Sequence, residues 1–271
     1  MVDPVARLVC DAGAAIGEAP LWLGDRLLWT DPVEKRLLGF VDGALTAQPV
    51  AQSVWSLGIL PDGSVAGTLD DAFFAVDANG TISPGLAALL DPGCRLNDMA
   101  VDASGGLWAG VMHRGLLATR GAIVHARTLD AMPQIVAAGL GVPNGIAFSA
   151  DGMTLYVIDT LARTLLAYPA FNGMLGEPVV MSDFLGLPGK PDGMALGPDG
   201  SFWVAMWGGA CIVQLAPGGA FLRQIAIPAP HVSSLCFAGP ERLFVTTSRM
   251  RLSPQALAEH PGSGALFEIA L

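Results

Sequence analysis

Residues 190–209, KPDGMALGPDGSFWVAMWGG, contain the pattern that decides the fold. A Pro-Asp-Gly turn leads into a short apolar run, a second Pro-Asp-Gly at 198–200 reverses the chain, and another apolar run ends at Trp207. Two apolar runs of about five residues joined by a Gly-containing turn predict a β-hairpin. Asp192 then lies at the mouth of the first strand, where it is the polar residue that precedes the apolar run.

The same pattern recurs six times along the chain. Each copy has a polar or special first residue, alternating apolar residues, a turn, and a second strand with an aromatic or aliphatic marker about 10 to 12 residues on. Successive markers are roughly 36 to 48 residues apart, which is the spacing of four-stranded propeller blades. The first residues are Glu18, Trp55, Asn97, Asn144, Asp192 and Ser233, and the markers are Trp29, Val65, Trp108, Tyr156, Trp203 and Phe244.

These repeats predict an all-β fold, a six-bladed β-propeller of four-stranded antiparallel blades that spans residues 1–271 as a single domain. Stacked blades bury both faces of each sheet, which one blade cannot do alone. We expect the N-terminal strand at 5–11 and the C-terminal strand at 265–271 to share one blade and so close the ring. A two-sheet sandwich is the competing architecture, but it does not explain six equal registers.

Helical periodicity is almost absent from the sequence. The best helical segment is SPQALAEH at 253–260, because Ser253 is a good N-cap and Pro254 suits the first helical position. We therefore predict one short helix in an otherwise all-β chain.

Composition excludes several classes of function. The formal net charge is −10 and Lys and Arg form no cluster, so nucleic acid is not an expected partner. No apolar run approaches the roughly 18 residues of a membrane span, and the N-terminus lacks the pattern of a leader peptide. We expect no membrane association and a cytoplasmic location. The four cysteines form no CxxC pair and predict buried, reduced thiols: Cys10, Cys94, Cys211 and Cys236.

The repeats differ most at their first residues. Inner strands of a propeller surround the central axis, so these six positions are expected to converge. They carry two carboxylates, two amides, a hydroxyl and an indole, and such oxygen donors suit Ca²⁺, Mg²⁺ or Mn²⁺. Two formal charges would leave a bound ion cationic and able to act as a Lewis acid. Asn144-Gly145 and Asp192-Gly193 are also common turn dipeptides, so a purely structural interpretation stays open.

Four ordered motifs resemble the SMP-30/gluconolactonase/LRE family. They are GEAPLW at 17–22, RLNDMAVDASGGLWAG at 95–110, PNGIAFSADGMTLYVIDT at 143–160 and PDGMALGPDGSFWVAMWGG at 191–209. The C-terminal run IPAPHVSSLCFAGPERLFVTTSR is most similar to the bacterial gluconolactonase and xylonolactonase branch. The resemblance covers nearly the whole chain. It implies a six-bladed propeller that opens a lactone ring, most directly that of a sugar (aldono) lactone, with the help of a divalent metal ion.

The resemblance also implies roles for five residues. Glu18, Asn144 and Asp192 would be the metal ligands, with Ca²⁺ as the preferred ion and Zn²⁺, Mn²⁺, Mg²⁺ or Fe²⁺ as alternatives. Asp192 would in addition be the catalytic acid–base residue, and Arg95 and Asn97 would bind the substrate. All of these except Arg95 are also positions that the repeat register singles out.

A serine hydrolase mechanism is not indicated. The G-x-S-x-G motif is absent, and His113 and His231 have no acidic residue nearby in the sequence. The indoles of Trp55 and Trp207 would either wall the pocket or pack within blades.

One loop departs from the family pattern. Relatives often carry a polar or acidic loop after the strand that ends at His113, whereas residues 114–121 are RGLLATRG, with two arginines and no acid. Such a loop would either cover the pocket or pack on the surface. A covered pocket would suit a substrate that has fewer hydroxyl groups or that carries an anion.

Two alternative functions stay open beside the sugar lactonase. One is a non-catalytic calcium-binding or interaction propeller, and the other is a lactonase or esterase for non-sugar lactones. The expected partner is a small-molecule lactone, and the chain is expected to be a monomer or a homodimer.

Overall fold

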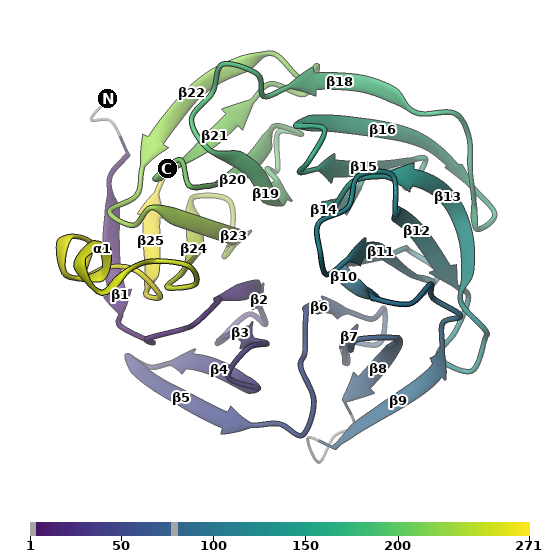
Figure 1. The fold of residues 1–271 in the computed structure, drawn as a ribbon, viewed down its shortest axis with the longest axis horizontal. Helices are drawn as coiled ribbons and strands as arrows, with labels where there is room; N and C mark the ends of the chain where they lie inside the picture. The colour runs from purple at the N-terminus through teal and green to yellow at the C-terminus, as the bar shows by residue number, and fades with distance from the viewer. Residues whose placement is uncertain (1–3, 77–80) are drawn as a thin grey trace. The chain divides into compact units, whose positions relative to one another are not determined.

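The computed structural model describes residues 4–76 and 81–271. The first three residues of the N-terminal segment, for which we predict no leader peptide, lie outside this description. The described chain consists of antiparallel strands and one helix, so the predicted all-β class is confirmed (Figure 1). Its helix is too short to cross a membrane.

The chain forms two compact units. The first unit comprises Met1–Ser53 with Phe184–Leu271, and the second comprises Val54–Asp183. Each is described below by itself. Sheets of four antiparallel strands recur in both units, an arrangement consistent with a β-propeller.

The first unit contains one separate four-stranded sheet and one eight-stranded sheet. The eight-stranded sheet consists of two groups of four strands joined by the pairing of Trp207 with His231. The separate sheet is formed by β2 (Glu18–Trp22), β3 (Leu27–Asp31), β4 (Arg36–Val41) and β5 (Ala44–Pro49). The two groups are β19 (Lys190–Leu196), β20 (Phe202–Trp207), β21 (Cys211–Leu215) and β22 (Phe221–Ala226), and β23 (His231–Phe237), β24 (Arg242–Ser248), β25 (Leu266–Ala270) and β1 (Ala6–Cys10).

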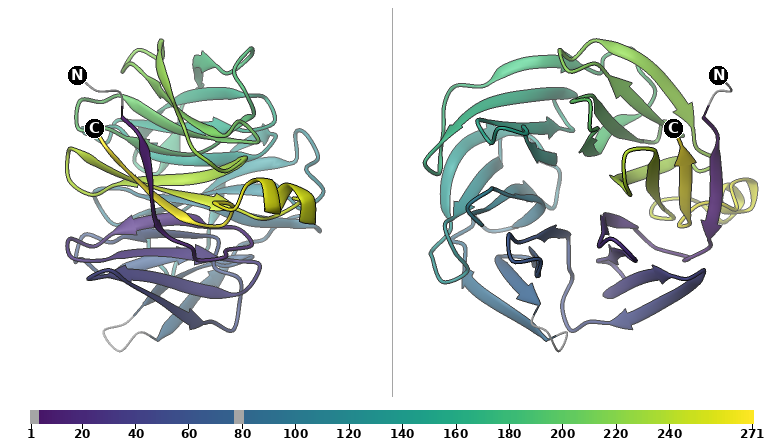
Figure 2. Two further views of the ribbon diagram at one scale, coloured as in Figure 1. Left: turned by 90° about the vertical axis from the view of Figure 1, so that its left-hand side faces the viewer. Right: turned by 180° about the vertical axis from the view of Figure 1, so that it is seen from behind.

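The two ends of the chain meet in the first unit. Strand β1 pairs antiparallel with β25, and Figure 2 shows the purple N-terminal strand beside the yellow C-terminal strand. The predicted helix is confirmed as α1 (Pro254–Glu259), which has proline in its first turn. The hydroxyl of its N-cap, Ser253, accepts the Ala256 N–H at 3.1 Å.

The second unit contains three sheets, two of four strands that pair in chain order and one of five strands whose last strand pairs with its third. The first is formed by β6 (Ser56–Ile59), β7 (Val65–Thr68), β8 (Ala72–Val76) and β9 (Ile82–Ala87). The second is formed by β10 (Cys94–Val101), β11 (Leu107–His113), β12 (Gly121–Ala126) and β13 (Gln134–Leu140). The third is formed by β14 (Pro143–Phe148), β15 (Thr154–Asp159), β16 (Thr164–Phe171), β17 (Met174–Leu175) and β18 (Val179–Asp183).

The six predicted hairpins are all present, and each marker residue lies on the second strand of its hairpin. Three markers, Trp29, Trp108 and Trp203, are at most 2% exposed, so they form part of the core. A buried indole N–H needs an acceptor, and the turn before the strand supplies one in two cases. The N–H of Trp108 donates to Asp102 at 2.8 Å, and that of Trp203 donates to Ser201 at 3.0 Å.

All four cysteines, which lie in the described chain, are free thiols, as predicted, but Cys211 alone among them is fully buried, and Cys10, Cys94 and Cys236 are partly exposed. Burial raises the pKa of the Cys211 thiol to about 11 and that of Cys236 to about 12. Burial, helped by the Asp11 carboxylate, raises the pKa of Cys10 to about 11. The thiolate is the reactive form, so these three thiols stay protonated and inert at neutral pH.

We therefore expect iodoacetamide at pH 8 to modify these three cysteines far more slowly in the folded protein than in urea. Peptide mass spectrometry over a time course measures each site separately, and the urea sample is the reference for full reaction. Rapid alkylation of Cys236 in the folded protein would contradict its burial.

Candidate functional site

Irregular strand pairing marks the first strand of five of the six repeats in the described chain. The pairing of β2, β10, β14, β19 and β23 with the next strand shifts register, whereas β6 pairs regularly with β7. Bulges re-aim side chains and are over-represented beside active sites. The shifts contain or adjoin the first residues of the repeats: Glu18, Asn97, Asn144, Asp192 and Ser233.

In the first unit, strand β23 lies beside both β2 and β19. The Ser233 hydroxyl of β23 donates a hydrogen bond to the carbonyl oxygen of Gly17, the residue before Glu18. Ala19, the residue after Glu18, has a positive φ of 47°. The position of Glu18 is therefore fixed on both sides. The bulge and the left-handed backbone of Ala19 follow it, and the hydrogen-bonded carbonyl group of Gly17 precedes it.

Asp192 is held against the same strand by the glycine that follows it. A Cβ added to Gly193 would lie 2.5 Å from Ser234 Oγ and 2.8 Å from the carbonyl oxygen of Ser233. Only glycine lets β19 approach β23 this closely. Asp192 is only 6% exposed, so its carboxylate is buried. The aspartate of an ordinary turn is instead exposed to solvent. Glu18 and Asp192 thus flank one strand of the first unit.

Asp31, the last residue of β3, supports the segment that leads into Glu18. Its Oδ2 accepts the N–H of Ala15 at 3.0 Å and pairs with Arg36 Nη2 at 2.6 Å, and its Oδ1 accepts the N–H of Ile16 at 3.4 Å. Asp31 is fully buried, and a buried charge is stable only when it is paired and hydrogen-bonded. This carboxylate therefore fixes the backbone just before Glu18.

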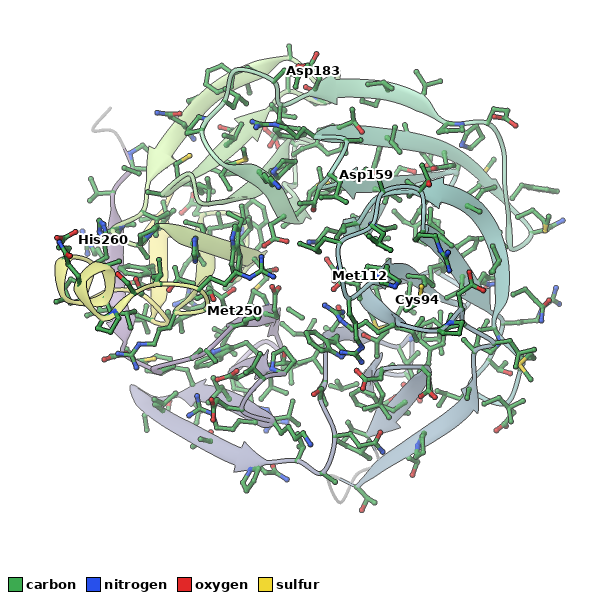
Figure 3. The ribbon with its side chains drawn as sticks, viewed as in Figure 1. Cys94, Met112, Asp159, Asp183, Met250 and His260 are labelled. Carbon is green, nitrogen blue, oxygen red and sulfur yellow. The ribbon has the colours of Figure 1, made fainter. Side chains whose placement is uncertain are left out.

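Asp159, the last residue of β15 and labelled in Figure 3, has the same role in the second unit. Its two oxygens accept the N–H groups of Gly141 at 2.8 Å and Val142 at 3.2 Å. Oδ1 also accepts the N–H groups of Leu161 and Ala162 in the turn that follows. Asp159 thus fixes the backbone that leads into β14, on which Asn144 lies.

Sequence reasoning missed both Asp31 and Asp159. A signal existed, because an aspartate ends the second strand in the first and fourth repeats, whose first residues are Glu18 and Asn144. Those are two of the three predicted metal ligands.

The second unit brings Arg95, Asn97 and the segment of Asn144 together. Arg95 Nη1 donates to Asn97 Oδ1 at 2.8 Å, and Asn97 Nδ2 donates to the carbonyl oxygen of Pro143 at 2.9 Å. Arg95 also donates to the Leu96 carbonyl oxygen at 2.7 Å. Arg95 and Asn97 are 8% and 9% exposed, so both polar side chains are held inside the protein. Met112, labelled in Figure 3, lies opposite Arg95 on the paired strand β11.

Asp98 is a further residue that the sequence analysis did not single out. Its Oδ1 accepts the Ser56 hydroxyl at 2.7 Å and the Met99 N–H at 2.9 Å. Burial raises the pKa of the Asp98 carboxyl, and hydrogen bonds from these groups and from the N–H groups of Gly145 and Ile146 oppose that shift. Asp98 therefore ties β10 both to β6 and to the bulge after Asn144.

The loop at 114–121 is anchored by two ion pairs, which explains its two arginines. Arg114 Nη2 lies 2.8 Å from Asp70 Oδ1, and Arg120 Nη2 lies 2.9 Å from Asp91 Oδ2. Asp70 Oδ1 also accepts the indole N–H of Trp55 at 2.7 Å. The loop has no acidic residue of its own, and the two carboxylates that pair with its arginines come from other parts of the second unit.

Trp207 and His231 form an aromatic pair in the first unit. Their ring centroids are 4.3 Å apart and the planes differ by 11°, so the rings are stacked. Burial lowers the pKa of His231, opposed by a hydrogen bond to the Met250 backbone. The lowered pKa favours the neutral form of the ring. His113 instead accepts the Gly115 N–H at Nδ1, at 3.0 Å, which places it in the turn after β11.

The predicted metal ligands fit a hard cation by their chemistry. Within the described residues, no group of three or more His, Cys, Asp or Glu side chains could hold a metal ion. The predicted set of Glu18, Asn144 and Asp192 has two carboxylates and one amide, so it is not a cluster of that kind. Carboxylate and amide oxygens are the donors that Ca²⁺ takes in proteins.

The protein is all-β, and its four-stranded antiparallel sheets are consistent with a β-propeller. Buried polar residues lie where the first strands of several repeats begin with a bulge. Residues 16–249 match the family model of the SMP-30/Gluconolactonase/LRE-like region, and the chain belongs to this family. The resemblance found from the four motifs is thereby confirmed.

Similar proteins include enzymes that are named as sugar lactonases. The 6-deoxy-6-sulfogluconolactonase of Pseudomonas putida is 29% identical over 98% of this chain and 94% of its own. The pentonolactonase XacC of Haloferax volcanii is 32% identical over 90% of this chain and 85% of its own. The crystal structure of the calcium-binding protein regucalcin from Agrobacterium tumefaciens is 28% identical, with a TM-score of 0.88 over 98% of this chain and 93% of that chain.

Proposed function

We propose that this protein is a sugar lactone hydrolase that depends on one divalent metal ion. The observation that carries the proposal is the placement of the family-motif residues Glu18, Asn97, Asn144 and Asp192 at or beside bulges in the first strands of their repeats. The names of the lactonase relatives support the substrate class. The six hairpins and their four-stranded sheets support a six-bladed propeller as the scaffold.

Glu18, Asn144 and Asp192 are proposed as the metal ligands, and Ca²⁺ is the proposed ion. Two carboxylates and one amide suit a hard cation, and the regucalcin relative is described as a calcium-binding protein. When bound, the ion supplies a Lewis acid that polarises the lactone carbonyl.

The remaining chemistry is assigned to the chain's own side chains. Asp192 accepts the proton of the attacking water and returns it to the ring oxygen, which leaves as a hydroxyl group of the opened acid. Its burial keeps competing solvent away from the carboxylate. Arg95 and Asn97 hold oxygen atoms of the substrate, and the hydrogen bond between them keeps both groups in one arrangement before the substrate arrives.

Chelation tests the metal dependence. We expect treatment with EDTA followed by desalting to lower the rate of aldonolactone hydrolysis by about 100-fold or more, and Ca²⁺ to restore it. Calorimetry provides a second measurement, in which Glu18→Gln should weaken Ca²⁺ binding in the absence of substrate. A metal-free protein that retains the untreated rate would overturn the metal-dependent mechanism.

A second candidate function is calcium binding without catalysis, which the regucalcin relative favours. A panel of sugar, aliphatic and aromatic lactones with several divalent ions separates the two functions. Metal binding without turnover of any lactone would support the second candidate. Turnover of aliphatic or aromatic lactones alone would instead assign the site to a non-sugar lactonase.

A further inference from the structure

We propose that Asp70 is a positioning residue that orients the substrate-binding Arg95 through the indole ring of Trp55. The inference rests on the proposed lactonase function, because it assumes that Arg95 contacts the substrate. Asp70 lies between β7 and β8, 25 residues before Arg95 in the sequence, and belongs to none of the motifs of the family resemblance.

The first step is the contact between Arg95 and Trp55. The guanidinium carbon of Arg95 lies 3.4 Å from the centroid of the Trp55 ring, so the guanidinium rests on the indole face. A cation over an indole is attracted by the negative face of the ring, and the attraction is stronger when the pair is desolvated. The tilt of the Trp55 ring therefore acts together with the hydrogen bonds to Asn97 and Leu96 in setting the direction of the Arg95 donors.

The second step is the control of that tilt by Asp70. The sheet holds the backbone of Trp55, because its N–H donates to the Thr68 carbonyl oxygen at 2.9 Å. The ring itself is held at its edge, where Nε1 donates to Asp70 Oδ1 at 2.7 Å. An indole turns about two side-chain torsions, and a hydrogen bond at its edge opposes both rotations.

The third step is the anchoring of Asp70 beside Arg95. The Asp70 carbonyl oxygen accepts the N–H of Leu96, the residue after Arg95, at 2.8 Å. Its carboxylate also pairs with Arg114, whose N–H donates in turn to the carbonyl oxygen of Gly93 at 2.9 Å. Asp70 is thus fastened to the start of β10 by its backbone and to the loop after β11 by its side chain.

The ion pair with Arg114 keeps the acceptor charged and in place. Burial of Asp70 opposes ionisation, but hydrogen bonds from Trp55 and Arg114 and the positive charges of Arg114 and Arg95 outweigh it and lower the pKa of the carboxyl. The side chains of Arg114 and Asp70 are 47% and 51% exposed, and ion pairs at such exposure contribute little to stability. This ion pair therefore acts mainly by orienting the Asp70 carboxylate and adds little to the stability of the fold.

The test compares Asp70→Ala with Asp70→Asn and with Asp71→Ala. Asp71 is the exposed neighbour whose backbone carbonyl holds Ala88, so Asp71→Ala controls for a general disturbance of the turn. We expect Asp70→Ala to raise KM for the lactone about 10-fold while kcat changes less than about 3-fold, because substrate positioning is lost. Asp70→Asn keeps an oxygen for the indole N–H and should restore most of the affinity.

A double-mutant cycle tests whether Asp70 acts through the indole. Trp55→Phe keeps an aromatic face but removes the N–H donor, so adding Asp70→Ala to it should raise KM little further. Independent, additive effects of the two substitutions would overturn the coupling. So would an unchanged KM in Asp70→Ala.

An NMR measurement tests positioning without any turnover. Stacking on an indole shifts the Arg95 Nε–H resonance upfield, and Asp70→Ala should move it back toward the position of a solvated arginine. An unmoved resonance would contradict the proposal. If the wild-type protein hydrolyses no lactone, the proposed function fails, and this spectrum still decides whether Asp70 orients Arg95.

Discussion

Replacing Asp192 by Asn should lower kcat/KM for lactone hydrolysis by about 1000-fold or more while the protein stays folded. General acid–base catalysis alone is worth about 100- to 10,000-fold, and the amide can neither accept a proton from water nor return one to the ring oxygen. The substitution also removes one of the two negative charges that are proposed to hold the metal ion. Steady-state kinetics measures the loss, and thermal unfolding checks the fold.

Asp199→Asn is the matched control for this experiment. Asp199 lies in the turn of the same hairpin, where it accepts the Ser201 hydroxyl at 2.6 Å and the Ser201 N–H at 3.0 Å. Because it stabilises the turn and is not one of the proposed site residues, its substitution should leave kcat/KM within about 2-fold of wild type. Equal losses in Asp192→Asn and Asp199→Asn would remove the special role of Asp192.

Gly193→Ala should lower both stability and activity, because β19 has no room for a side chain where it approaches β23. The added Cβ would lie 2.5 Å from Ser234 Oγ and 2.8 Å from both the Ser233 carbonyl oxygen and Ser234 Cα. Two of these atoms belong to backbone, so the strand itself must move. Overpacking of this kind costs about 1 to 3 kcal/mol. A shift of about 1 Å in Asp192 would lower kcat/KM about 100-fold.

Gly218→Ala provides the comparison for this substitution. A Cβ on Gly218 meets no atom within 4 Å, and its φ is not positive, so the change should alter stability by less than about 0.5 kcal/mol and leave activity intact. Urea unfolding and lactone kinetics of both variants measure the effects. A Gly193→Ala protein with wild-type stability and kcat/KM would refute the close contact of β19 with β23.

Local signals in the sequence predicted the hairpins and the helix. Turn dipeptides and the alternation of apolar residues act over about ten residues, so they set each hairpin without help from distant parts of the chain. The helix at 254–259 was predictable for the same reason, since its N-cap and proline are adjacent. The six-blade count depends on long-range stacking and remains a prediction.

The sequence identified the first residues of the repeats but not the groups that hold them. Glu18 and Asp192 stand out because each is polar at the start of an apolar run. Asp31 and Asp159 do not stand out in the sequence, because aspartate is also a common residue of ordinary turns at strand ends. Asp98 resembles many exposed aspartates until its partner Ser56 is seen, 42 residues earlier in the chain.

The sequence by itself determined the fold class, the family and the candidate residues for metal and substrate, because repeat spacing and family motifs are properties of the linear chain. Only the tertiary structure showed the bulges, the contact of Gly193 with β23 and the path from Arg114 through Asp70 and Trp55 to Arg95. These features join strands that are distant in sequence. The packing of the folded chain determines such contacts, and no local pattern records them.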